Sequence, residues 1–214
     1  MCESFQDSFP LPDLDFDEYI IIRLDENIVD YPKQKINSNI EEIVQTFGFR
    51  LSNPEPIKAT KESSVYKSYC QYFSEDPNTT LVEEHALKIS KKKFRIQREY
   101  DNFQLLPNSP YLVQSYDLFE STDLIILQME LCERDILGLS FDDNSVCKLI
   151  HDVASALDVI HSSGFLHLDV SPSNILIKGN QFKLADFGTV IENGAFQRGD
   201  EGAGPYVSPE IFAF

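Results

Sequence analysis

Three polar residues near the end of the chain are spaced so that they could act on one substrate. Asp169 is followed five residues later by Asn174, and Asp186 comes twelve residues after Asn174, in the segment KLADFG. A carboxylate can accept a proton from a hydroxyl group, and an asparagine with a second carboxylate supplies the oxygen ligands that Mg²⁺ prefers. Phosphoryl transfer needs this set, because it depends on holding the phosphates, offsetting their charge with metal and orienting the attacking hydroxyl.

Short strands are predicted on both sides of these residues. The segments 165–168 (FLHL), 175–178 (ILIK) and 182–185 (FKLA) are apolar runs, and a turn at Gly179–Asn180 joins the last two. The first two polar residues therefore fall on a loop between strands, and the third falls directly after a strand. Any one of them could be a surface residue, but the three in this order and context favour a catalytic site.

The clearest single predicted element is an amphipathic helix over residues 144–163. Asp143–Ser145 supply its N-cap, and Gly164 closes its end. Its apolar residues recur at helical spacing: Val146, Leu149, Ile150, Val153, Leu157 and Ile160. Helical stability in proteins comes mainly from packing such a face, so we expect this apolar stripe to need a cover.

Strands dominate the part of the chain that precedes this helix. A short basic helix is predicted over residues 91–106. The predicted strands are runs of β-branched and aromatic residues bounded by turns: residues 63–73, 81–90, 111–120 and 124–131. Strands first, then a helix and small hairpins, indicate an α+β fold with two lobes.

The beginning of the chain differs in composition from the rest. Residues 1–31 carry nine acidic residues against one basic residue, Arg23, with apolar side chains interleaved. Such a segment is either a solvated flexible tail or a docking segment for a partner. We expect a flexible N-terminal segment over residues 1–50, a small lobe over residues 51–132 and a second lobe over residues 133–214.

The bulk composition restricts partners and compartment. The net charge of −17 would repel nucleic acid and anionic membrane surfaces, so neither is expected as a partner. Four widely separated cysteines without a CxxC pair indicate neither a disulfide framework nor a zinc site, and we expect an intracellular protein of the nucleus or cytoplasm. The apolar runs are too short for a transmembrane segment.

The motifs resemble those of eukaryotic-type protein kinases. His167–Asp169 with Asn174 resembles the catalytic loop, Asp186–Gly188 resembles the DFG motif, and Ser208–Glu210 stands where the APE motif would. Ala86–Lys88 resembles the Ala-x-Lys of the third kinase strand. The resemblance implies a kinase-like two-lobed fold with a small β-rich N-lobe and a helical C-lobe. It also implies ATP as phosphate donor, Mg²⁺ as metal and a protein as substrate.

The resemblance also implies catalytic roles. Lys88 would contact the α- and β-phosphates, and it is favoured over the neighbouring Lys91–Lys93 because it lies on the apolar strand pattern. Its acidic partner on the helix would be Glu99, with Asp101 in reserve, since residues 89–98 contain no acid. The implied catalytic set is Lys88, Glu99, Asp169 and Asn174, and the implied Mg²⁺ ligands are Asn174 and Asp186.

A nucleotide slot is implied between the lobes. Met129, Glu130 and Cys132 fall where kinases have the gatekeeper and the hinge, whose backbone pairs with adenine. The remaining residues expected to bind nucleotide are Ile57, Val65, Ala86, Lys88 and Leu176, although the apolar ones could equally be plain core residues. Phe103, His167 and Phe187 would form a packed stack, in which His167 is structural rather than catalytic.

Three features depart from the kinase pattern. Lys58, Thr60 and Ser63 occupy the positions where the glycine-rich loop has glycines, so this loop should clasp ATP less well. Ser171 replaces the lysine that Ser/Thr kinases keep two residues after the catalytic aspartate. The sequence ends four residues after Glu210, where a kinase large lobe normally continues, so we expect an incomplete C-lobe that is less stable than the small lobe.

Two classes of function are consistent with these features. The segments HLDVSPSN, ELC and EGAGPYVSPE resemble the Wee-type kinases, which inhibit mitotic entry by phosphorylating cyclin-dependent kinases. The first class is therefore an ATP-dependent protein kinase that acts on a Ser/Thr or Tyr hydroxyl, with a cyclin-dependent kinase as the candidate substrate. The second is a kinase-like binding module, a pseudokinase or a fragment, that transfers phosphate slowly or not at all. Retention of Lys88, Asp169, Asn174 and Asp186 favours the enzyme.

Overall fold

A computed structural model describes residues 38–53, 55–73, 80–195 and 206. All of them lie in one compact unit of the chain, Gln34–Phe214. The acidic segment 1–31 and the APE-like Ser208–Glu210 lie outside the described residues. None of the helices in the described part of the chain is long and apolar enough to cross a membrane.

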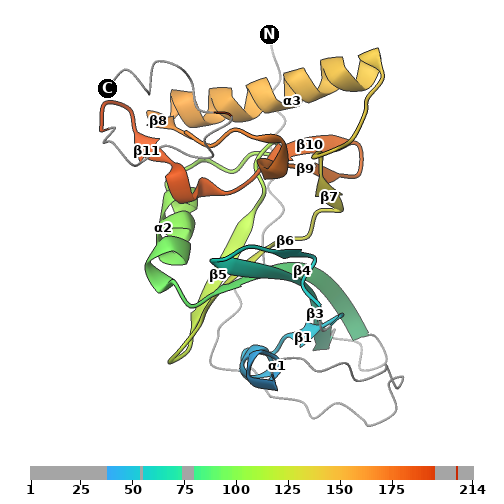
Figure 1. The fold of residues 1–214 in the computed structure, drawn as a ribbon, viewed down its shortest axis with the longest axis vertical. Coiled ribbons are helices and arrows are strands. Elements are labelled where there is room, and N and C mark those ends of the chain that lie inside the picture. The colour runs from blue at the N-terminus through green and yellow to red at the C-terminus, as the bar shows by residue number, and fades with distance from the viewer. Residues whose placement is uncertain (1–37, 54, 74–79, 196–205, 207–214) are drawn as a thin grey trace. The chain divides into compact units, whose positions relative to one another are not determined.

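The small lobe is built on a six-stranded antiparallel sheet with the order β1-β3-β4-β6-β5, in which β2 pairs with β3 (Figure 1). Its strands are β1 (Arg50–Leu51), β2 (Lys58–Ala59), β3 (Ser63–Phe73), β4 (Thr80–Ser90), β5 (Ser115–Glu120) and β6 (Ile125–Glu130). The strands predicted at 63–73, 81–90 and 124–131 are thus confirmed. Strand β5 begins at Ser115 rather than at residue 111, because Tyr111 and Val113 form backbone hydrogen bonds with Leu184 instead.

Helix α1 (Ser38–Thr46) was not predicted from the sequence. It packs on the sheet through Val44, and Phe49 lies in the same apolar cluster as Tyr66, Leu87 and Ile126. Residues 38–50, which the sequence-based division assigned to the flexible segment, therefore form a helix and the first strand of the sheet. The apolar residues Ile40, Ile43, Val44 and Phe47 have the spacing of one helical face.

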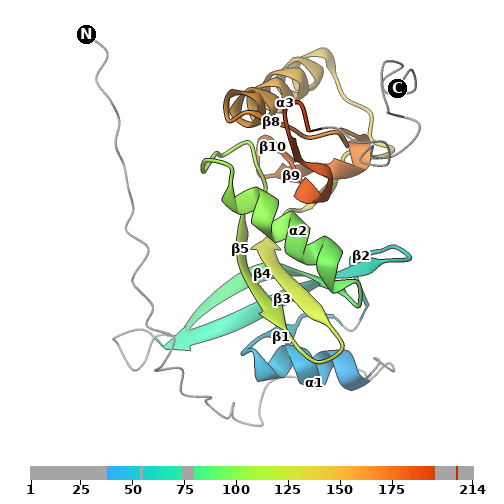
Figure 2. The same cartoon turned by 90° about the vertical axis from the view of Figure 1, so that its left-hand side faces the viewer.

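Helix α2 (Lys93–Gln104) corresponds to the predicted basic helix over residues 91–106. It buries Ile96, Glu99 and Phe103. The helix packs against β5 and β6 on the sheet and against the 3-10 turn η3 (Phe187–Thr189) of the second lobe (Figure 2). It therefore carries contacts from one lobe to the other.

The large lobe combines one long helix with short strands. A three-stranded sheet has the order β10-β9-β7, and β11 pairs with β8. The elements are β7 (Arg134–Asp135), α3 (Asp143–Ser162), β8 (Phe165–Leu166), η2 (Pro172–Asn174), β9 (Ile175–Lys178), β10 (Gln181–Leu184) and β11 (Ile191–Glu192). The predicted hairpin is confirmed, since Gln181 pairs with Lys178 across Gly179–Asn180. Gly179 has a φ of +58°, which suits glycine at this turn.

Helix α3 begins one residue earlier than predicted. Its N-cap is Asp142 rather than a residue of 143–145, because the extended backbone of Asp142 lets its carboxylate accept a hydrogen bond from Ser145 N at 2.8 Å. The predicted apolar stripe is only partly buried: Ile160 is fully buried, whereas Val146 and Ile150 are 39% and 63% exposed. The most buried face instead includes Asp152 and Ala156.

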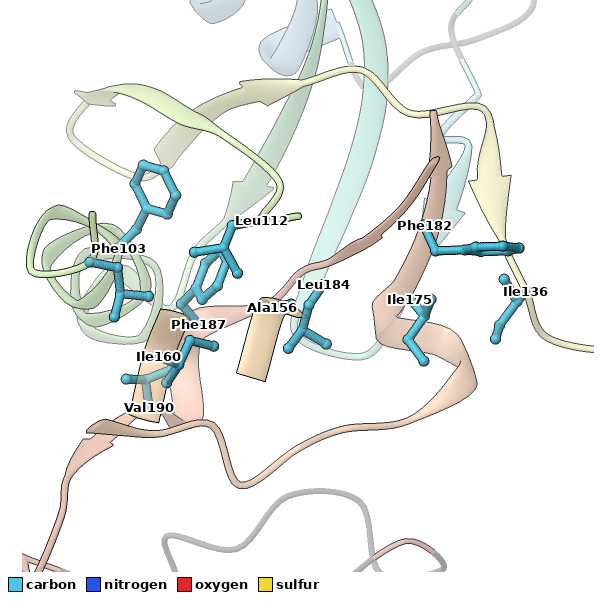
Figure 3. Packing of buried hydrophobic residues seen from close by; sticks show 11 residues of the cluster. Phe103, Leu112, Ile136, Ala156, Ile160, Ile175, Phe182, Leu184, Phe187 and Val190 are labelled. Carbon is cyan, nitrogen blue, oxygen red and sulfur yellow. The ribbon is translucent and has the colours of Figure 1, made fainter. Parts of the chain in front are cut away.

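Asp152 can be buried because both oxygens of its carboxylate have polar partners. Its Oδ2 accepts from Phe182 N at 3.0 Å and from Lys148 Nζ at 2.8 Å, and this ties α3 to β10. Phe182 also belongs to a core that side chains of both lobes form together (Figure 3). The buried residues of this core are Phe103, Leu106, Leu112, Ile136, Ala156, Ile160, Ile175, Phe182, Leu184, Phe187 and Val190.

Candidate active site

A cavity of about 470 Å³ is lined by residues of both lobes. This volume is in the range of small-molecule and cofactor sites. All of the residues predicted to bind nucleotide line it: Ile57, Val65, Ala86, Lys88, Met129, Glu130, Cys132 and Leu176. The predicted residues Glu99, Asn174 and Asp186 line it as well. The structure thus brings the adenine-slot residues and the charged residues to one place.

Lys88 is held between two carboxylates. Its Nζ lies 2.6 Å from Glu99 Oε2 and 3.2 Å from Asp186 Oδ2. Strand β4 places Lys88 between Val65 of β3 and Leu127 of β6, and the buried face of α2 carries Glu99. The reserve candidate, Asp101, is exposed and accepts a hydrogen bond from Gln97 instead. Of the two predicted partners, the structure places Glu99 beside the lysine.

The electrostatics of this cluster stabilise the lysine as an ammonium. Burial lowers the pKa of Lys88, but Glu99 and Asp186 outweigh burial and hold that pKa above its usual range. Burial raises the pKa of Asp186, but Lys88 outweighs it and holds the pKa below its usual range. Burial also raises the pKa of Glu99, to about 7, against the opposing effect of Lys88. The cluster therefore presents the Lys88 ammonium, with the ionised carboxylate of Asp186 beside it, to the cavity.

Asp186 owes its position to an unusual backbone conformation. Its φ is +65°, in the left-handed region that few residues other than glycine adopt, and its carboxylate accepts from Gly188 N at 3.4 Å as the N-cap of η3. A left-handed residue of this kind costs about 1–3 kcal/mol and is retained where the surrounding structure imposes it. Here the ion pair with Lys88 and the packing of Phe187 impose it.

Asp169 and Asn174 form a second linked pair. Asn174 Nδ2 donates to Asp169 O at 2.9 Å and to Asp169 Oδ2 at 2.8 Å. Asn174 O accepts from Ala185 N at 2.8 Å, so this loop is attached to the residue just before Asp186. The three residues that the sequence singled out are therefore joined through short contacts, and their catalytic roles stay predictions.

His167 is buried and has a structural environment. Its Nδ1 accepts from Asp169 N at 3.2 Å and its Nε2 faces Ala185 O at 3.2 Å, an arrangement that a neutral ring protonated on Nε2 satisfies. Burial lowers the pKa of His167, which also favours the neutral ring. Its ring packs edge-on against Phe187, and Phe187 packs against Phe103. The structure thus contains the predicted stack of these three residues.

The predicted metal ligands can be tested for fit from their contacts. The amide nitrogen of Asn174 is bound to Asp169, so its amide oxygen is the atom that could ligate a cation. Asp186 Oδ2 lies 3.2 Å from Lys88 Nζ, and Asp186 Oδ1 lies 3.4 Å from Gly188 N. These contacts are long, so the carboxylate can also bind a cation. Among the described residues, no group of three or more His, Cys, Asp or Glu could hold an ion. Sites for Mg²⁺ with nucleotides commonly use one or two carboxylates plus phosphates, and these two residues fit such a site.

The loop at the glycine positions is a tight hairpin without left-handed residues. Thr60 N donates to Ser63 O at 2.9 Å, and Thr60 Oγ1 accepts from Glu62 N and Ser63 N at 3.2 and 3.1 Å. Glu62 at its tip pairs with Lys92 and Arg95 at the start of α2. In the described chain the non-glycine residues with positive φ are Leu168 and Asp186, so this hairpin does not need glycine to form. Its shape is instead set by the Thr60 hydrogen bonds, and its tip contacts α2 through Glu62.

A buried ion pair that the sequence did not reveal joins the end of β6 to β10. Lys183 Nζ lies 2.7 and 2.9 Å from the Glu130 carboxylate oxygens, and both side chains are largely buried. Cys132 lines the cavity nearby, and burial raises the pKa of its thiol to about 11. The thiol is therefore protonated at neutral pH and is a poor nucleophile.

Two further residues near the site were missed because their partners are distant in sequence. Asn102 on α2 donates through Nδ2 to Phe187 O at 2.7 Å and Val190 O at 2.9 Å, and so ties the helix to η3. Asp135 on β7 lines the cavity. Neither had a local pattern that would have identified it.

Comparisons with known proteins agree with this geometry. Residues 78–213 match the protein kinase domain family model. The mitosis inhibitor protein kinase mik1 of Schizosaccharomyces pombe is 32% identical over 181 residues, which are 77% of this chain and 30% of that protein.

Two other relatives are similar over comparable ranges. The membrane-associated tyrosine- and threonine-specific cdc2-inhibitory kinase wee-1.3 of Caenorhabditis briggsae is 26% identical over 69% of this chain and 23% of its own length. The carbon catabolite-derepressing protein kinase of Candida glabrata is 27% identical over 78% of this chain and 29% of its own length. The chain thus spans less than a third of each of these relatives.

Proposed function

This chain belongs to the protein kinase family, and on that premise we propose that it transfers the γ-phosphate of ATP to a hydroxyl group of another protein. The observation that carries the proposal is a linked set of charged and polar side chains at one cavity, to which Asp169 is attached through Asn174 without lining the cavity itself. Lys88 is paired with both Glu99 and Asp186, and Asn174 is bound to Asp169. This set contains the elements for binding phosphates, holding a divalent ion and orienting a hydroxyl.

Each part of the set has a distinct task in this proposal. The Lys88 ammonium binds phosphate oxygens, and Glu99 holds its position from the helix side. Asn174 and Asp186 hold Mg²⁺, which would offset phosphate charge when bound. Val65, Ala86 and Leu176 contribute apolar walls for the adenine ring.

The reaction itself requires one proton acceptor and one aligned oxygen. Asp169 accepts the proton of the substrate hydroxyl as its oxygen forms a bond to the γ-phosphorus. The bond from the γ-phosphorus to the bridging oxygen breaks, and that oxygen leaves with ADP. Hydrogen bonds from Asn174 keep the Asp169 carboxylate oriented during this step.

Replacing Asp186 with asparagine tests the assignment of the site. The Asp186→Asn protein should fold and should have a similar unfolding midpoint. The reason is that Lys88 keeps its ion pair with Glu99 when it loses the one with Asp186. Its transfer of labelled phosphate should fall by a factor of about 100 or more, as for the loss of a group that stabilises transition-state charge. A folded variant with wild-type turnover would contradict the assignment.

For the substrate, we propose a cyclin-dependent kinase, as in the Wee-type family. Support comes from the sequence motifs and from relatives whose names describe a mitosis inhibitor and a cdc2-inhibitory kinase. Such a substrate would place the protein inside the cell, in the nucleus or cytoplasm. The test is transfer of labelled phosphate to a cyclin-dependent kinase, compared with the same protein lacking the Tyr and Thr hydroxyls of its glycine-rich loop.

One observation favours a second candidate, a kinase-like binding module with weak transfer. The hairpin at the glycine positions is pinned by Glu62, and the side chain of Lys58 crosses the cavity. Nucleotide binding without measurable transfer, under conditions in which an authentic kinase domain is active, would select this candidate.

A further inference from the structure

Lys58 forms a bridge across the candidate nucleotide cavity. It lies on β2 of the small lobe, and its Nζ donates to Ser173 O of η2 at 2.7 Å. The same Nζ lies 3.5 Å from Asp135 Oδ2 on β7. All three residues line the cavity, so one side chain spans it between the two lobes. We call these contacts the Lys58 bridge.

The bridge is held more loosely than the ion pairs that Lys88 and Lys183 form with carboxylates lining the cavity. Lys88 and Lys183 each lie within 2.7 Å of a largely buried carboxylate. Lys58 has a neutral carbonyl as its close partner and a carboxylate only at 3.5 Å, and its side chain is 43% exposed. Phosphate oxygens carry full negative charge, whereas the close partner of Lys58 is a neutral carbonyl, so phosphates can compete for this ammonium.

Contacts from this hairpin to phosphates have to come from a side chain rather than from the backbone. In a glycine-rich loop the backbone itself approaches the phosphates. Here Thr60 closes the turn through four hydrogen bonds, and Glu62 attaches its tip to Lys92 and Arg95. A lysine side chain has a flexible four-carbon stem with a charged end, so it can move while the hairpin stays fixed.

A movement of the Lys58 side chain would bring positive charge to phosphates beside the large-lobe loop around Ser171 and Ser173. Ser171 is buried and its Oγ lies 2.9 Å from Ser173 Oγ, so this stretch offers hydroxyls rather than a cation. Acids are close by, since Asp135 and Asp186 line the same cavity and Asp169 is hydrogen-bonded to Asn174, which lines it too. A triphosphate placed against these acids needs added positive charge, and the Lys58 ammonium can reach this loop.

We propose that Lys58 exchanges partners when nucleotide binds: its ammonium leaves Ser173 and Asp135 and binds the phosphates. Lys58 is then a residue that discriminates nucleoside phosphates from nucleosides. This inference rests on the proposed function, because it assumes that the cavity takes ATP. Adenosine must displace the bridge without replacing its contacts, whereas ATP displaces it and supplies new ones.

Calorimetric binding of ATP with Mg²⁺ and of adenosine tests the inference on wild type, Lys58→Met and Lys61→Met. Lys61 is the matched control, because it is exposed on the same hairpin and lies outside the set of residues that line the cavity. Lys58→Met should weaken ATP binding about tenfold, as expected for loss of one charge-assisted contact, and should leave adenosine binding equal or tighter. Lys61→Met should change neither, and Lys58→Arg should keep most of the preference for ATP.

The outcomes separate this inference from the proposed function. If Lys58→Met changes the affinities for ATP and adenosine by the same factor, Lys58 is only a structural bridge and the inference is overturned. No change in either affinity overturns it as well. Wild type that binds neither ligand would overturn the proposed function, and this result is distinct from an unchanged preference in a protein that binds both.

Discussion

Gly188 occupies a position where any side chain would press on the carboxylate of Asp186. A Cβ added to Gly188 would lie 3.3 Å from Asp186 Oδ1 and 4.0 Å from the Cβ of Glu99. The first contact is tighter than usual, so the carboxylate would have to move by a few tenths of an ångström. Because Asp186 also contacts Lys88 at 3.2 Å, this movement would alter both the ion pair and the proposed metal site.

Gly188→Ala should therefore affect metal use more than stability. We expect the Mg²⁺ concentration for half-maximal phosphate transfer to rise about tenfold, since small misplacements of catalytic groups can cost up to a hundredfold in rate. The unfolding free energy should change by less than about 1 kcal/mol, as is typical where no buried contact is lost. A titration of transfer rate with Mg²⁺ measures the first effect and chemical denaturation the second. An unchanged Mg²⁺ requirement would show that Asp186 is not the ligand.

Some residues of the site can be recognised from the sequence around them, and others cannot. Asp169, Asn174 and Asp186 lie within one short stretch, so their spacing and the strands around them identified them. Lys183 and Glu130 are separated by 53 residues and meet only when both lobes are folded. Their pairing is therefore a property of the tertiary structure. The Lys58 bridge, over 115 residues, could not be read from the sequence for the same reason.

At the scale of elements, periodicity identified the long helix and strands but not their exposed sides. Helix α3 has the predicted apolar spacing, yet Ile150 is exposed while Asp152 is buried. The reason is that β10 approaches the helix at Asp152 and supplies Phe182 N as a hydrogen-bond donor. Helix α1 was missed because it is short, nine residues, and follows an acidic segment. Two-residue strands such as β7 have no periodicity to detect.

Phe49, which lies between helix α1 and strand β1, packs against a buried histidine whose charge state should affect this contact. His85 on β4 is 7% exposed, and its ring packs edge-on against Phe49 and Tyr116. Neither ring nitrogen has a hydrogen-bond partner among the described residues, although Glu83 Oε2 lies 3.6 Å from Nε2. Burial lowers the pKa of His85, helped by Lys178 and opposed by Glu83.

The direction of the pH effect follows from this lowered pKa. The unfolded chain binds a proton on His85 below about pH 6.5, whereas the folded protein resists it, so the unfolded state binds more protons in this range. Stability contributed by the neutral ring is therefore complete above about pH 6.5 and is lost as the pH falls below it. His85→Leu should reduce the loss of unfolding free energy between pH 7.5 and 5.5 by about 1 kcal/mol. Denaturation curves that shift in parallel for both proteins would contradict this account.

At the scale of the whole molecule, the two lobes share one of their cores. Phe103 of α2, Leu106 just after that helix and the fully buried Leu112 belong to the same cluster as Ala156 and Leu184 of the large lobe. The small-lobe cluster around Leu87 and Ile126 is separate. The small lobe therefore has a core of its own, whereas the large lobe completes its core with residues that precede β5.

The shared core leads us to expect unequal stability in the two parts of the chain. Strands β3 and β4 have 11 residues each, whereas the strands of the large lobe have two to four. Helix α3 also leaves Val146 partly exposed and Ile150 mostly exposed. Covering an apolar side chain of this size contributes about 1.5–3 kcal/mol, so the deficit on α3 is a few kcal/mol. The deficit would be larger if the whole apolar stripe of α3 were exposed, but Leu149, Val153 and Leu157 pack against the core.

Hydrogen exchange on the 214-residue chain, combined with two matched substitutions, tests this organisation. In the wild type we expect weaker amide protection over residues 143–190 than over residues 60–130. Leu112→Ala and Ile126→Ala each remove a fully buried aliphatic side chain, and each should cost about 2–5 kcal/mol. Leu112→Ala should reduce protection in both α2 and α3, because its cluster contains residues from both, whereas Ile126→Ala should act mainly on the strands of the small lobe. Equal protection of the two regions in a monomeric sample, or an effect of Leu112→Ala confined to the small lobe, would show that the large lobe is stable by itself.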